Sequence, residues 1–203
     1  MDGGGKMTER IAGIILAAGL SKRMGRPKAL LQIGGETFLA RIVSLARAAG
    51  LDPLRIVVSE HRALIEKALP ELADHLVTND RPELGQLHSL RLGLRSLPHD
   101  CAAAMMFLVD HPRMQPATLQ KIVRAFKKGE GEIILPVHGG RRGHPVVFGR
   151  AVFAELLEAP LDKGARHVVR SRPDRVCEVE VDDAGILADI DTPGDYEELS
   201  GND

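Results

Sequence analysis

The segment Ile11–Lys28 reads IAGIILAAGLSKRMGRPK, and it decides how the rest of the chain is interpreted. The apolar run from Ile11 to Ala18 is typical of a strand buried in a parallel sheet. Small residues and cations follow within ten positions, and such residues let backbone N–H groups and positive charge approach oxyanions. The segment contains neither G-x-x-x-x-G-K-[ST] nor G-x-G-x-x-G. It therefore predicts either a phosphate-binding loop that differs from both of these motifs or an ordinary turn with solvated charges.

The composition excludes several classes of protein. The chain has 203 residues, of which 44% are hydrophobic and 27% charged, as in a globular protein with one well-buried domain. The net charge is -1, which indicates no general attraction to nucleic acid or to an anionic membrane. Cys101 and Cys177 lie far apart, so we expect no disulfide framework and no zinc site.

The domain organisation follows from the same survey. Residues 1–10 are Gly-rich and polar, and we expect a disordered leader there. Residues 11–200 show no linker or repeat and predict a single domain. No apolar run approaches 18 residues, so we expect no membrane span and a cytoplasmic protein.

Strand and helix patterns alternate along most of the chain. Short apolar runs predict strands at 11–18, 54–59, 102–109, 132–137, 145–148, 175–181 and 186–190, and a further strand within 72–78. Helical spacing predicts helices at 38–49, 61–69, 87–97, 116–127, 151–157, 164–171 and 192–199. The alternation predicts an α/β fold with three layers, α/β/α, around a Rossmann-like, mostly parallel sheet. Ligands of such sheets bind beyond the carboxyl ends of the strands, where the Gly19–Lys28 loop, Asn79 and Asp110 fall.

The order L-A-A-G-x-S-x-R-M-G-x-x-K resembles the N-terminal signature of nucleotidyltransferases that move NMP from an NTP onto a phosphorylated acceptor. Within them it is most similar to the MobA-like group that makes molybdenum cofactors. The matching residues are Leu16, Ala17, Ala18, Gly19, Ser21, Arg23, Met24, Gly25 and Lys28. The resemblance implies a nucleotide-diphospho-sugar transferase type of fold. It also implies that the Leu16–Ser21 stretch binds the nucleotide, and that Arg23 and Lys28 bind the triphosphate as catalytic residues.

Acidic residues at two distant points are candidate metal ligands. Asp110 ends an apolar strand, where a carboxylate needs a cation or hydrogen bonds, so it either caps the next turn or binds a metal. The family resemblance implies that this D-x-P aspartate holds catalytic Mg²⁺, with His111 replacing the usual Gln or Met. The family's D-I-D-T-P segment recurs as Asp189–Pro193, and strand alternation would put Asp189 and Asp191 on one face. We favour Asp191 over Asp189 as the second ligand, although Asp191 could instead cap the last helix.

The nucleoside and the acceptor have separate candidate segments. Asn79, Gly85 and Ser89 resemble the family's N-P-x-x-x-x-G-x-x-x-S nucleoside segment, with Asp80 where Pro is usual. By itself, Ser89 would be an ordinary first-turn helix residue. Gly143-His144-Pro145 resembles the turn that faces the acceptor in the molybdenum branch, and the neighbouring Arg142 suits a phosphate monoester. The alternative for Arg142 is a solvated charge.

The resemblance implies a reaction in which an acceptor phosphate oxygen attacks the α-phosphorus of the NTP and pyrophosphate leaves. Positioning and charge neutralisation would supply most of the catalysis, with Mg²⁺ as cofactor. Guanylyl enzymes of the group tend to carry Gly where this chain has Ala18, which favours CTP. We therefore expect a cytidylyltransferase acting on molybdopterin, with a molybdoenzyme or its chaperone as a further partner. The alternatives are a sugar- or polyol-phosphate nucleotidyltransferase and a non-catalytic nucleotide-binding α/β domain.

Overall fold

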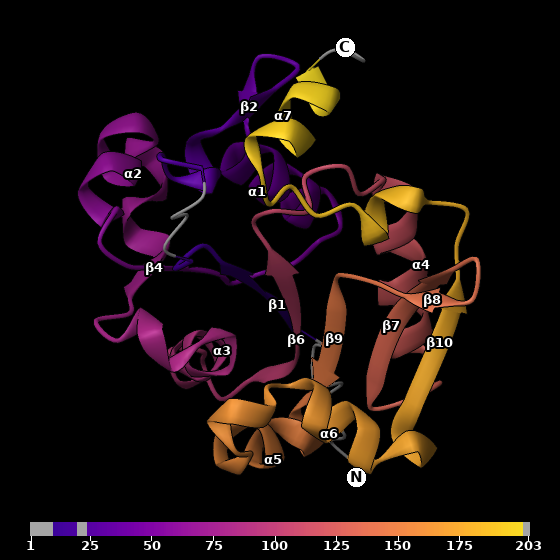
Figure 1. Ribbon diagram of the computed structural model, residues 1–203. Coiled ribbons are helices and arrows are strands. Elements are labelled where there is room, and N and C mark those ends of the chain that lie inside the picture. Colours follow the sequence, from indigo (N-terminus) through magenta and orange to yellow (C-terminus); the bar gives the residue numbers. More distant parts are fainter. Residues whose placement is uncertain (1–9, 20–23, 201–203) are drawn as a thin grey trace, which may run out of the picture.

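The computed structural model describes residues 10–19 and 24–200 of the chain. They form an eight-stranded sheet in the spatial order β10-β7-β9-β6-β1-β4-β5, with β8 beside β7, and a two-stranded hairpin, β2-β3 (Figure 1). The strands are β1 Arg10–Leu16, β2 Gln32–Ile33, β3 Glu36–Thr37, β4 Leu54–Val58, β5 Leu76–Thr78, β6 Cys101–Leu108, β7 Ile133–His138, β8 Arg141–Arg142, β9 Val146–Gly149 and β10 Val176–Glu180. The helices are α1 Phe38–Ala48, α2 Arg62–Ala68, α3 Gln86–Arg95, α4 Pro116–Lys127, α5 Phe153–Glu158, α6 Arg166–Ser171 and α7 Pro193–Ser200. Arg10 begins β1, and the other residues of the predicted leader lie outside the described residues.

Parallel pairing dominates the sheet. β1 pairs in parallel with β4 and β6, β4 with β5, and β7 with β10. β9 runs antiparallel between β6 and β7. The predicted α/β fold with a mostly parallel sheet is therefore confirmed.

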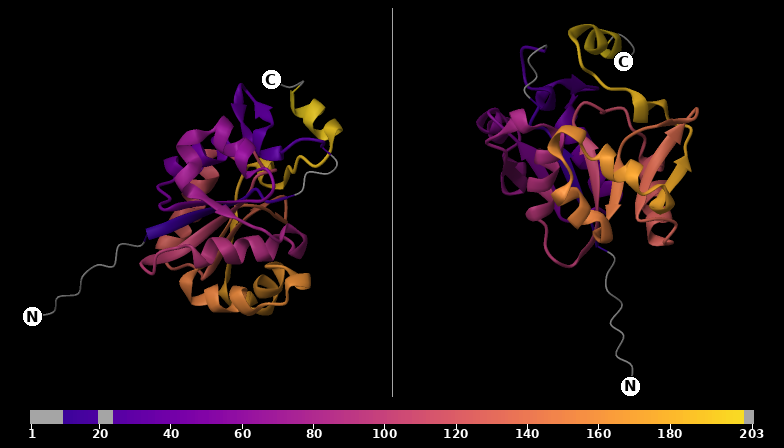
Figure 2. Two further views of the ribbon diagram at one scale, coloured as in Figure 1. Left: turned by 90° about the vertical axis from the view of Figure 1, so that its left-hand side faces the viewer. Right: turned by 60° about the horizontal axis from the view of Figure 1, so that its bottom comes forward.

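Alternating side chains of the central strand β1 pack into two separate hydrophobic cores, one on each face of the sheet. Ile11 and Ile15 pack with α1 and α4 on one face, while Ile14 packs with α3 on the other. A Cβ added at Gly93 of α3 would lie 2.6 Å from Ile14 Cγ2, so glycine permits this close helix–strand contact. Each fully buried Ile or Leu contributes about 1.5–3 kcal/mol. Figure 2 shows the resulting layers, with α3, α5 and α6 on the face opposite α1 and α7.

Helix ends follow local chemistry. Thr37 Oγ1 accepts a hydrogen bond from Ala40 N at 3.2 Å and so caps the N-terminus of α1. Gly50 follows that helix with φ of 77°. Within the described residues, the structure contains no helix of the length and apolarity that a bilayer crossing requires.

Two predicted strands near the site have different outcomes. The strand expected within residues 72–78 is β5, which follows the 3₁₀ segment Pro70–His75. The strand predicted at 186–190 is wrong, because Ala184–Leu187 is a 3₁₀ turn. Asp183 bends the chain there by accepting a hydrogen bond from Gly185 N at 2.9 Å. We call residues 183–191 the strap, because they cross the carboxyl end of the sheet without joining it.

Candidate active site

A cavity of about 430 Å³ lies at the carboxyl ends of β1, β4, β5 and β6. Its described lining residues come from segments that are far apart in the chain. They are Leu16, Ala17, Ala18, Gly19, Pro27, Lys28, Ala29, His61, Pro82, Gly85, Gln86, Ser89, Leu108, Val109, Asp110 and Asp191. Parallel strands place their carboxyl ends at one edge, which explains why these segments meet there.

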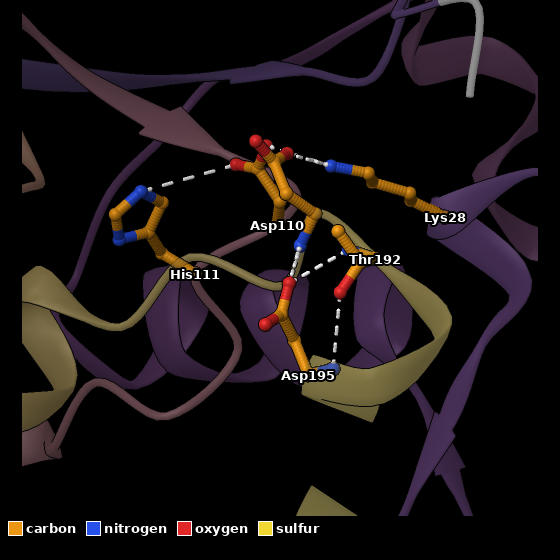
Figure 3. Close-up of polar contacts among 6 residues, drawn as sticks. Lys28, Asp110, His111, Thr192 and Asp195 are labelled. Carbon is orange, nitrogen blue, oxygen red and sulfur yellow. Dashed lines mark hydrogen bonds and ion pairs between the residues drawn. The ribbon is translucent and has the colours of Figure 1, made fainter. Parts of the chain in front are cut away.

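Lys28 lies between the two acidic residues that the sequence singled out. Its Nζ donates a hydrogen bond to Asp110 Oδ2 at 3.3 Å and also contacts Asp191 Oδ1. Figure 3 shows Lys28 and Asp110 pointing toward one another. The Lys28 side chain is only 13% exposed, so solvent screens these charges less than it would at the surface.

The segment that carries Asp191 is held by the next helix. Asp191 N and Thr192 N donate to Asp195 Oδ2 at 2.9 and 2.7 Å, and Asp195 N donates to Thr192 Oγ1 at 3.2 Å (Figure 3). The hydrogen bond from Thr192 N, followed by those from Thr192 Oγ1 and Asp191 N, lowers the pKa of Asp195. This is a capping box, so Thr192 caps α7 and the Asp191 side chain is directed to Lys28 instead. Asp189 is exposed, and the strand alternation invoked to pair it with Asp191 does not exist.

The backbone of Asp110 anchors the strap as well. Ile190 N donates to Asp110 O at 2.9 Å, which holds the residue next to Asp191 against the end of β6. The two carboxylates thus share one lysine although Asp110 and Asp191 lie 81 positions apart in the chain.

The donor set at this point suits a hard divalent cation. Asp110 and Asp191 supply carboxylate oxygens around a position already next to a cation, the Lys28 ammonium group. The described residues contain no group of three or more His, Cys, Asp or Glu side chains that could hold a metal without a substrate. Mg²⁺ characteristically takes one or two carboxylates together with substrate phosphates, so these residues fit it.

Two histidines stand beside Asp110. The rings of His111 and His144 are 5.2 Å apart, centroid to centroid, and His111 Nε2 is 4.0 Å from Asp110 Oδ1. Burial lowers the pKa of His111, and burial followed by the neighbouring His111 lowers the pKa of His144 to about 4. Both Nδ1 atoms are buried without a hydrogen-bond partner among the described residues. These imidazoles are therefore neutral at pH 7 and keep hydrogen-bonding capacity beside the carboxylates.

The predicted nucleoside segment divides into two roles. Gly85 and Ser89 line the cavity, whereas Asn79 is 1% exposed and lies behind it. Asn79 Nδ2 donates to Ser89 Oγ at 2.9 Å, and its Oδ1 accepts from Arg81 N at 2.9 Å. Asn79 thus orients the loop and Ser89 rather than reaching into the cavity. Gly85 has φ of 86°, a conformation that favours glycine.

The remaining predicted residues fall into three groups. Leu16, Ala17, Ala18 and Gly19 line the cavity directly after β1, and Ser59 Oγ donates to Ala18 O at 3.1 Å. Ser21 and Arg23 lie outside the described residues. Arg142, Gly143 and His144 line a second cavity, Pro145 is buried beside it, and Arg142 donates to Glu178 Oε1 at 2.8 and 2.5 Å.

His61 and Gln86 also line the first cavity, although no motif of the sequence pointed to them. His61 comes soon after β4, and Gln86 begins α3 after β5. Their position just beyond strand ends is the signal that could have identified them.

Comparisons with known proteins agree with this geometry. The family model described as the MobA-like NTP transferase domain matches residues 13–176. A probable molybdenum cofactor guanylyltransferase from Opitutus terrae is 32% identical over 130 residues, which are 64% of this chain and 62% of that protein. The match thus spans less than two thirds of that relative.

Solved structures with similar folds extend over nearly the whole chain. The crystal structure of Rv0371c from Mycobacterium tuberculosis H37Rv is 33% identical, with a TM-score of 0.84 and coverage of 95% of this chain and 97% of that one. A complex of Rv0371c with manganese is 31% identical, with a TM-score of 0.81 and coverage of 96% and 100%. The chain therefore belongs to the family of MobA-like NTP transferase domains, as its N-terminal signature predicted.

Proposed function

We propose that this nucleotidyltransferase moves CMP from CTP onto the phosphate of a molybdopterin-type acceptor and releases pyrophosphate. The observation that carries the proposal is the convergence of Lys28, Asp110 and Asp191 on the wall of one cavity. The family membership supplies the reaction class.

Each residue at this point has a defined task in the proposal. Lys28, held between the carboxylates, binds the α-phosphate when the nucleotide enters, and the backbone after Ala18 together with Arg23 binds the β- and γ-phosphates. Asp110 and Asp191 hold Mg²⁺, which supplies charge neutralisation at the phosphate oxygens. The manganese complex of Rv0371c supports a divalent cation.

The acceptor needs no strong general base. Its phosphate is already an anion at neutral pH, so an oxygen can form the new bond to the α-phosphorus while the bond to the β-phosphate oxygen breaks. The protein contributes orientation and charge, and the neutral His111 and His144 add no competing positive charge beside the metal ligands. The product would then pass to a molybdoenzyme or its chaperone.

The choice of base depends on one methyl group. Ala18 is 5% exposed and lines the cavity, so its methyl narrows the space beside the base, which supports CTP. GTP is the second candidate, because the Opitutus relative is called a guanylyltransferase.

Incubation of the purified protein with Mg²⁺, each NTP and pyrophosphatase tests the proposal when molybdopterin and sugar phosphates are supplied in parallel. Phosphate release with CTP and molybdopterin is the expected result. Release with GTP instead would reassign the base. Turnover of sugar phosphates but not molybdopterin would overturn the acceptor, and full activity of a folded Asp110→Ala protein would overturn the metal assignment.

A further inference from the structure

The second cavity, of about 460 Å³, has an apolar floor and a basic rim. Leu87, Met106, Leu135, Val146, Phe148 and Val169 form the floor. The charged lining residues are Arg142, Asp162, Lys163, Arg166 and Arg170. Four cations therefore face one carboxylate around an apolar surface.

The four cations around the second cavity differ in whether they have an acidic partner. Arg142 is paired with Glu178 at 2.5 Å. Within the described part of the chain, Lys163, Arg166 and Arg170 form no ion pair. We call these three residues the α6 rim. Three cations within eight positions of the chain repel one another, and the one acidic side chain beside them in the described lining, Asp162, is exposed. An anion bound there would relieve this repulsion.

The second cavity lies next to the first, because Gln86 lines both of them. His144, at the edge of the second cavity, contacts the ring of His111 next to Asp110, and its buried Nδ1 has no hydrogen-bond partner among the described residues. The turn that carries His144 is held in place, because His144 N donates to Ile186 O of the strap at 3.0 Å.

The α6 rim and the candidate metal ligands belong to different layers of the fold. Val168 of α6 belongs to the core that α3 and α5 share, whereas Leu199 of α7 belongs to the opposite core. Figures 1 and 2 show α6 and α7 well apart on the two faces of the sheet. A ligand with its phosphate near Asp110 and its body on the apolar floor would present its far end to the α6 rim.

We infer that Lys163, Arg166 and Arg170 bind a second anionic group of the acceptor, distinct from the reacting phosphate. The substrate class is thus a phosphate monoester that carries an additional anionic substituent and has an apolar face. This inference rests on the proposed function and narrows its acceptor. Sugar and polyol phosphates, whose bodies are neutral and polar, would leave both the floor and the rim without a partner.

A matched pair of probes tests the inference. The probes p-carboxyphenyl phosphate and p-carbamoylphenyl phosphate have nearly the same shape, but only the first carries a second anion. Each is titrated by NMR into isotope-labelled protein that is saturated with Mg²⁺ and a non-hydrolysable α,β-methylene CTP. We expect the carboxylate probe to bind about tenfold more tightly, which corresponds to one charge-assisted hydrogen bond, and to shift the amide signals of Gly164, Ala165 and Val169.

Two charge-matched double variants test whether the α6 rim causes the preference for the carboxylate probe. The double variant Arg166→Ala/Arg170→Ala should bind both probes with affinities within about twofold of each other. The control Arg47→Ala/Arg95→Ala removes two exposed helix arginines outside both cavities and should keep the preference. Equal or undetectable binding of the two probes to the wild-type protein, or a preference that survives in the Arg166/Arg170 variant, would overturn the inference. If the CTP analogue itself does not bind, then the proposed function fails, and that outcome is read independently of the probes.

Discussion

Thr118 Oγ1 of α4 donates a hydrogen bond to Asp183 Oδ2 at 2.7 Å and so fastens the strap to the helix beside β6. Gln115 N donates to the same oxygen at 2.8 Å, and Gly185 N donates to Asp183 Oδ1. Asp183 is only 2% exposed. The position of Asp191 over the cavity therefore depends on a buried carboxylate eight residues earlier.

Asp183→Ala should destabilise the protein, because it leaves three donors without their acceptor. We expect a loss of about 3 kcal/mol in the free energy of unfolding, measured by urea denaturation. The fraction of variant that remains folded should also bind Mn²⁺ more weakly, since the strap that carries Asp191 loosens. Asp182→Ala, at an exposed neighbouring position, is the control and should change stability by less than about 0.5 kcal/mol. Equal stability of the two variants would contradict this role of Asp183.

Lys28→Met should separate metal binding from turnover. The variant removes the cation between Asp110 and Asp191, so Mn²⁺ should bind the nucleotide-free protein several-fold more tightly, as measured by electron paramagnetic resonance titration. Turnover should fall by about 10²–10³-fold, because the α-phosphate loses its cation. Lys67→Met, on the exposed side of α2, should leave both quantities unchanged. Weaker metal binding by Lys28→Met would show that Lys28 does not compete with the metal.

Single carboxylate-to-amide changes should identify the second metal ligand. Asp191→Asn should raise the Mg²⁺ concentration needed for half-maximal activity by at least about tenfold, since a neutral amide is a weaker ligand. Asp189→Asn should have little effect, because that side chain is exposed and, among the described residues, Asp191 and not Asp189 pairs with Lys28. The reverse order of the two effects would transfer the assignment to Asp189. Both variants should keep the wild-type melting temperature within a few degrees.

The pKa of His144 predicts an acid-sensitive fold. Burial lowers this pKa to about 4 in the folded protein, against about 6.5 in the unfolded chain. The unfolded state therefore binds the proton first as the pH falls, so stability is complete above about pH 6.5 and decreases toward pH 4 by up to about 3 kcal/mol. His144→Gln should flatten this decrease in urea denaturation curves collected from pH 7 to pH 4. His99→Gln, at an exposed position, should not flatten it.

Local signals were sufficient for most elements of the fold. The apolar runs ending at Leu16 and Leu108 predicted the two central strands, because a strand that is buried on both faces needs apolar residues at nearly every position. The strand predicted at 186–190 failed for a non-local reason. Gly185 lies so close to the 110–118 region that a Cβ would be 2.3 Å from Arg113 O, and hydrogen bonds to Asp183 replace a strand ladder. The residue types within that segment do not predict those partners.

The sequence order of small residues, cations and aspartates was enough to identify the family of the chain. It also identified the candidate ligands of the nucleotide and the metal. The tertiary structure decided how they are used: Asp191 rather than Asp189 reaches Lys28, Asn79 lies behind the cavity, and His111 stands between Asp110 and His144. The physical reason is that residue type and spacing encode backbone conformation and local chemistry, whereas the direction of a side chain in a loop depends on packing against other segments of the folded chain.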